Sequence, residues 1–129
     1  MPAPVVPATS RWFRLACGLM AGLLGVCVVL QLDDPDPVRW MAIYGAGAVA
    51  SGLLPSTRPA AALALLVGLG AAAWALYLAN TVWGVIGLSD LTSKMSEKGG
   101  AVEVGREAGG LAIEAAWLLA AGAFRGTRA

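Results

Sequence analysis

The segment formed by residues 31–44, QLDDPDPVRWMAIY, places three carboxylates and two prolines between two long apolar runs. A proline disfavours the helical conformation of the residue before it, so we expect Asp34 and Asp36 to be extended and the first helix to end there. Asp36 is a favourable N-cap and Pro37 a favourable first residue for a second helix. The segment therefore predicts two helices joined by a short turn, which sets how the whole chain is threaded.

The runs on either side of this turn have the composition of a membrane protein. Hydrophobic residues make up 58% of the 129 residues and charged residues only 13%, with a mean hydropathy of +0.72. Soluble domains carry about 25% charged residues. About 20 apolar residues in a helix cross a hydrocarbon core of about 30 Å. We expect helices over residues 12–32, 37–54, 60–85 and 101–124.

Residues 88–100, between the third and fourth expected helices, are polar, with apolar residues at helical spacing. This pattern predicts a short interfacial helix. The expected fold is an all-α, integral membrane four-helix bundle at residues 12–125. We expect a disordered tail at residues 1–11, which contain three prolines, and a short C-terminal tail at residues 126–129.

Four spans put both termini on one side of the membrane, together with the turn between the second and third helices. That side carries five arginines and no acid: Arg11, Arg14, Arg58, Arg125 and Arg128. The opposite side carries four basic residues: Arg39, Lys94, Lys98 and Arg106. Because short cytoplasmic loops are enriched in Lys and Arg, we expect cytoplasmic termini. The expected location is a cell membrane, in a bacterium the inner one.

Acidic residues are expected to gather on the other, non-cytoplasmic face, because the loops after the first and third helices share that side. On the last helix, three glutamates fall within a stripe about 40° wide. Arg39 and Arg106 are candidate partners for these acids. Trp40 and Tyr44 lie one turn apart, where an interfacial aromatic belt is expected. The candidate polar cluster consists of Asp33, Asp34, Asp36, Arg39, Glu103, Arg106, Glu107 and Glu114.

Two interpretations of this cluster remain open. It can be a salt-bridge network at the end of the bundle, where acids complement the dipole of the last helix. It can also be a cation site whose oxygen ligands suit calcium, magnesium or manganese, and no particular metal is assigned. Glu114 lies about 10 Å further along the helix than Glu107, and an acid within a span is by default a functional hypothesis. The alternative for Glu114 is a protonated side chain bonded to Ser51 or Asn80.

Several classes of function lack support in the sequence. The chain has no histidine, and it contains no nucleophile paired with a base and no cofactor motif, so we expect neither an enzyme nor a bound cofactor. Its net charge is only +1 without a basic patch, which argues against nucleic acid as a partner. Cys17 and Cys27 would be about 15 Å apart along one helix, too far for a disulfide, and are expected to be buried as small apolar residues.

Two blocks of residues carry a resemblance to a known family. The first consists of Gln31, Asp34-Pro35-Asp36-Pro37, Trp40, Ile43 and Tyr44, and the second of Glu103, Arg106-Glu107, Gly110-Leu111 and Ile113. Over about residues 12–120, the chain resembles the transmembrane protein 220 family. Asp33 departs from the Asn often found there, and Glu114 is not a typical family position. The resemblance implies a four-helix integral membrane protein and names no activity, cofactor or partner.

The abundance of small residues suggests how the protein functions. Alanine and glycine allow helices to approach closely in lipid, and Gly18 and Gly22 form a G-x-x-x-G pair. We therefore expect a non-catalytic structural or interaction protein in contact with membrane lipid, which associates with itself or with another membrane protein through Ala/Gly-rich helix faces. The alternative is an ion-binding or transport protein that uses the acidic cluster at the non-cytoplasmic face.

Overall fold

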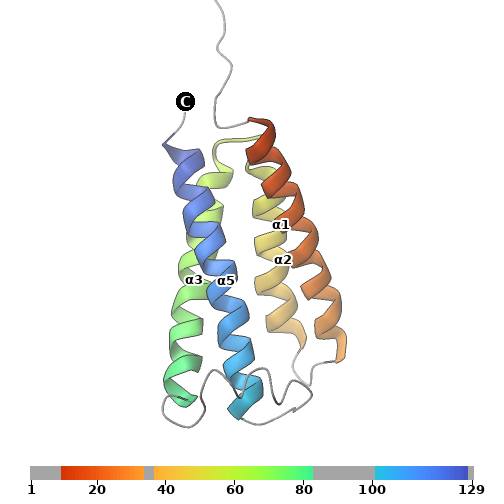
Figure 1. Ribbon diagram of the computed structural model, residues 1–129, viewed down its shortest axis with the longest axis vertical. Coiled ribbons are helices and arrows are strands. Elements are labelled where there is room, and N and C mark those ends of the chain that lie inside the picture. Colours follow the sequence, from red (N-terminus) through yellow and green to blue (C-terminus); the bar gives the residue numbers. More distant parts are fainter. Residues whose placement is uncertain (1–9, 34–36, 83–100, 128–129) are drawn as a thin grey trace, which may run out of the picture.

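The computed structural model describes residues 10–33, 37–82 and 101–127, and these residues form a bundle of α-helices (Figure 1). The helices are α1 (Arg11–Leu30), α2 (Pro37–Leu53), α3 (Ala60–Val82) and α5 (Ala101–Gly126), with a 3-10 turn, η2 (Gln31–Asp33), after α1. Successive helices run in opposite directions, so the start of α1 and the end of α5 lie at the same end of the bundle (Figure 1). The prediction of an all-α fold with four helices is confirmed for the described residues.

The ends of the helices follow local sequence signals. The Ser10 hydroxyl caps α1 by accepting a hydrogen bond from the backbone N–H of Phe13 at 3.3 Å, so the helix begins at Arg11, inside the tail expected over residues 1–11. α1 ends at Leu30, two residues before the expected end, because the chain tightens into η2. The expected interfacial helix and the expected end of the third helix, at residue 85, lie outside the described residues.

Three of the described helices are long and apolar enough to cross a membrane: Arg11–Leu30, Ala60–Val82 and Glu103–Gly126. α2 is shorter, with 17 residues, which correspond to about 26 Å of helix. It lies against α1 (Figure 1). The chain is therefore a multi-pass membrane protein.

The helices pack as two hairpins. α1 packs mainly against α2, and α3 packs most extensively against α5, while α2 links the two pairs through smaller contacts with α3 and α5. Only 11% of the apolar window of α1 is buried, compared with 39% of that of α5. Most of the α1 surface is consequently left for contact with lipid or with another helix.

Small residues form the contact between α3 and α5. Ala64, Gly68 and Ala71 are buried along one face of α3. A Cβ atom added to Gly68 would lie 3.0 Å from Cγ of Leu119, and one added to Gly122 would lie 3.2 Å from the carbonyl oxygen of Ala61. Close helix approach of this kind is what small residues permit in lipid. The Ala/Gly-rich faces of these two helices therefore pack against each other within one chain.

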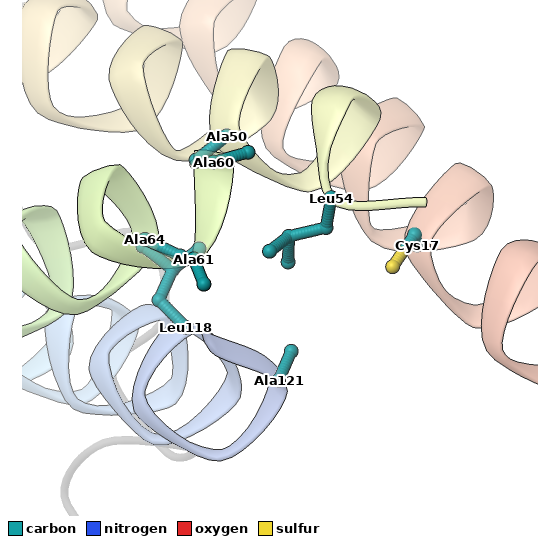
Figure 2. Packing of buried hydrophobic residues seen from close by; sticks show 8 residues of the cluster. All are labelled: Cys17, Ala50, Leu54, Ala60, Ala61, Ala64, Leu118 and Ala121. Carbon is teal, nitrogen blue, oxygen red and sulfur yellow. The ribbon is translucent and has the colours of Figure 1, made fainter. Parts of the chain in front are cut away.

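The core near the α2–α3 turn joins residues from every described α-helix (Figure 2). Leu54 and Leu118 are fully buried among alanines, including Ala50 and Ala64, and the side chain of Cys17 from α1 completes the cluster. This cluster holds the two hairpins together at the end where the described chain starts and finishes.

Candidate functional site

Glu114 lies near the middle of α5, and its side chain is fully buried. Its carboxyl group lies against Gly47 of α2, where Oε2 occupies the space that a Cβ atom on Gly47 would need. From that same Cβ position, Cδ of Glu114 is 3.1 Å away and Cδ1 of Leu24 in α1 is 3.2 Å away. The absent side chain of Gly47 thus makes room for a carboxyl group between α5 and the α1–α2 hairpin.

Neither carboxyl oxygen of Glu114 has a hydrogen-bond partner among the described residues. The Ser51 hydroxyl donates to the carbonyl oxygen of Gly47 at 2.8 Å and accepts from Nε1 of Trp117 at 2.9 Å. Asn80 is exposed on α3. The hydrogen bond predicted between Glu114 and Ser51 or Asn80 is therefore not formed, because Ser51 is engaged elsewhere and Asn80 faces outward.

Glu114 belongs to a line of polar contacts between α2 and α5, which run in the same direction (Figure 1). One turn before Gly47, the hydroxyl of Tyr44 lies over Gly110, 2.6 Å from the position of an added Cβ atom. One turn after Gly47, Ser51 bonds to Trp117. The order along both helices is therefore the same, and all three contacts lie between α2 of one hairpin and α5 of the other.

An aromatic and cationic stack lies toward the first turns of α2. The rings of Trp40 and Trp74 stack with centroids 4.3 Å apart, and the guanidinium of Arg39 lies 5.7 Å and 5.5 Å from the two ring centroids. Trp40 is only 2% exposed and Tyr44 is also buried. These two aromatic residues, expected in an interfacial belt, thus pack inside the bundle, where an Arg over aromatic faces is favourable.

Three further residues of the predicted cluster are described, and they lie near the same end. Glu103, Arg106 and Glu107 are half-buried in the first turns of α5, and each of them, like Arg39, interacts with a neighbour. Asp34, Asp36 and the side chain of Asp33 lie outside the described residues. Among the side chains that are described, no group of three or more acidic or sulfur ligands is placed to hold a metal ion. The predicted cation site stays a prediction.

At the opposite end of the bundle, two arginines form hydrogen bonds with carbonyl groups at the ends of helices. Nε of Arg125, which is 5% exposed, donates to the carbonyl oxygen of Leu54 at 2.8 Å. Nη2 of the exposed Arg58 donates to the carbonyl oxygen of Gly126 at 2.8 Å. Both arginines satisfy carbonyl groups at helix C-termini, where positive charge is favourable. An open cavity of about 470 Å³ lies at this end, and its lining includes the aromatic residues Phe13, Trp117 and Phe124.

Sequence reasoning treated Arg125 only as a charge that sets orientation, and it did not single out Gly47 or Gly110. No signal distinguishes these two among the 17 glycines of the chain. Their roles depend on which residue of the facing helix lies opposite, and this register is a property of the folded chain.

Comparison with known proteins places these residues in a family. A family model described as "Transmembrane family 220, helix" matches residues 23–122, which include all of α2 and α3 and most of α5. No solved structure matches the chain. The matched region covers well over half of the sequence and contains both blocks on which the resemblance was based. The chain belongs to transmembrane family 220.

Proposed function

We propose that this protein is a non-catalytic, four-span membrane protein that dimerises through the exposed face of α1. The observation that carries the proposal is a stripe of three glycines on α1, called the glycine stripe below: Gly18, Gly22 and Gly25. At about 100° per residue these glycines fall within about 60° on one helix face. A Cβ atom added at any of the three would meet nothing within 4 Å.

The contrast with the interior glycines supports this proposal. Gly47, Gly68 and Gly122 are each required by a neighbouring side chain or backbone atom of the same chain. The glycines of the glycine stripe have no such neighbour among the described residues. Glycine lowers helix propensity, so these positions disfavour the helix without serving a contact inside the chain. A second membrane helix is the partner to which a G-x-x-x-G face is suited. A second copy of the chain presents the same glycine stripe, so the two stripes can face each other across a twofold axis.

The proposal treats α2 as the fourth span. Its 17 residues reach the lower limit of about 17 that a spanning helix needs. Four crossings leave both termini on the side of Arg11, Arg14, Arg58 and Arg125, and the positive-inside preference assigns that side to the cytoplasm.

The oligomeric state in lipid vesicles tests the proposal. Wild type is expected to be dimeric when counted by single-molecule photobleaching at low protein density. Gly22→Leu places a bulky side chain on the glycine stripe, which prevents close approach of a second helix, and it should lower the dimer fraction at least tenfold. Gly70→Leu is the matched control, because Gly70 is also an exposed helical glycine with nothing within 4 Å of an added Cβ atom.

A dimer that persists in Gly22→Leu, or a wild type that is monomeric at all densities, would contradict the proposal. Loss of the dimer in Gly70→Leu as well would show that the effect is not specific to the glycine stripe on α1.

A further inference from the structure

We infer that Glu114 is a proton-binding site in the interior of the bundle, and that it carries its proton while the two hairpins are closed against each other. The site consists of the Glu114 carboxyl group, the space above Gly47 and the side chain of Leu24. The inference is independent of the proposed dimer, since the site lies inside one chain.

The carboxyl group of Glu114 is buried inside the bundle. Glu114 is 0% exposed, and both of its oxygens lack a hydrogen-bond partner among the described residues. An isolated ionised carboxylate is very unfavourable in an apolar environment, far more so than a neutral carboxyl group. The closed bundle therefore favours the neutral, protonated form.

The described surroundings of the carboxyl group suit a proton better than a metal ion, since no group of three or more acidic or sulfur ligands is found among the described residues. Calcium takes six to eight oxygen ligands and magnesium close to six. Gly47, which offers no side chain, and a Leu24 methyl group lie beside the position that Oε2 of Glu114 occupies. The hydroxyl of Ser51 is committed to Gly47 and Trp117. A proton needs no such shell, so it is the ligand that this site can hold.

The described titratable groups that interact with this site supply no balancing positive charge. Cys27 of α1 and Tyr44 of α2 lie close enough to interact electrostatically with Glu114, and Glu107 of α5 interacts with Tyr44. A thiol and a phenol are neutral near neutral pH, and a second carboxylate is negative. The titratable side chain of α3, Tyr77, is exposed and faces away.

Loss of the proton has a structural consequence. The negative charge would face Gly47 and Leu24, and it can be solvated only if water enters between α2 and α5. The contact between these two helices is small compared with the contact inside each hairpin. Deprotonation of Glu114 should therefore loosen the association of the hairpins while each hairpin stays paired.

Infrared spectroscopy of wild type with ¹³C-labelled glutamate side chains tests the protonation state. The chain has four glutamates. In vesicles, one protonated carboxyl band should persist after the other three glutamates have lost their protons on raising the pH. Glu114→Gln should remove this band and Glu107→Gln should retain it. Four glutamates that titrate together in wild type would overturn the inference, and this result requires no variant to fold.

Thermal unfolding as a function of pH tests the link to the closed bundle. Because the closed form holds the proton, the unfolding temperature of wild type should fall as the pH rises. Glu114→Gln, which is neutral at every pH and nearly isosteric, should lose this component of the pH dependence, while Glu107→Gln should follow wild type. The same pH dependence in wild type and Glu114→Gln would overturn the link.

Discussion

At the scale of single residues, the fold depends on polar groups that are placed where lipid or core would normally exclude them. Glu114 is buried without a hydrogen-bond partner among the described residues, whereas Arg125, also buried, donates to the carbonyl oxygen of Leu54. A satisfied buried group stabilises the fold, and an unsatisfied one lowers its stability by about 1–3 kcal/mol. Nη1 of Arg125 also lacks a partner among the described residues, but its Nε is bonded at a helix end, so Arg125 is a structural residue. Both oxygens of Glu114 lack a partner, and its position calls for a functional explanation.

Arg125→Ala should destabilise the protein more than Arg58→Ala. Removal of Arg125 leaves the Leu54 carbonyl without this donor in a buried environment, which should lower the free energy of unfolding by about 1.5–3 kcal/mol. Arg58 makes a bond of the same length to Gly126 but is exposed, and its loss should cost about 1 kcal/mol or less because water can replace it. Reversible unfolding in a mixed detergent series measures both, and equal losses would contradict this account.

At the scale of helices, the contact between α3 and α5 is the most extensive one between two described helices. Buried alanines and glycines alternate with Leu111 and Leu118 along this contact, so the two backbones approach closely. Because lipid is as apolar as a leucine side chain, close packing rather than hydrophobic burial stabilises such a pair.

Gly68→Leu should disrupt this contact, whereas Gly70→Leu should not. A side chain at Gly68 meets Leu119 and Leu118, while one at Gly70 meets open space two residues further along the same helix. Overpacking of this kind typically costs about 1–3 kcal/mol. Thermal stability of the two variants in the same detergent provides the comparison. If both variants are as stable as wild type, the helices do not approach as described.

The sequence predicted the helices well because length, hydropathy and proline position are local signals. Pro37 begins α2 as expected, and α3 begins at Ala60 as expected. It could not predict that Glu114 would face Gly47, because that depends on how α2 and α5 are rotated relative to each other. For the same reason, it could not predict that Trp40 and Tyr44 would be buried between helices, while their expected depth at the membrane interface stays a prediction.

At the scale of the whole molecule, the two hairpins place the described ends of the chain side by side. The rings of Phe13 and Phe124 are 5.0 Å apart between centroids, and Arg58 reaches the carbonyl oxygen of Gly126. The α2–α3 turn is at the same end (Figure 1). If α2 crosses the membrane, the start of α1, the α2–α3 turn and the end of α5 must all lie on the same side of the membrane.

With the proposed orientation, single cysteines at Ser10, Thr57 and Thr127 should react with a membrane-impermeant maleimide from the cytoplasmic side, and a cysteine at Thr81 from the other side. The native Cys17 and Cys27 are replaced by alanine for this experiment. Labelling of positions 10 and 127 from opposite sides would show an odd number of spans, and labelling of all three from outside would reverse the orientation.

The claim that the hairpins meet with the Glu114 carboxyl group seated on Gly47 is tested most directly by a double-mutant cycle on the free energy of unfolding. Gly47→Ala should destabilise wild type by about 1–3 kcal/mol, because the added methyl group competes with the carboxyl group for the same space. In the background of Glu114→Ala the carboxyl group is absent and only the flexible end of the Leu24 side chain lies close, 3.2 Å from the Cβ position. The same substitution should then cost less by about 0.5 kcal/mol or more, a coupling typical of residues in direct contact. An equal cost of Gly47→Ala in both backgrounds would show that the two residues do not meet, and it would contradict the account of the site.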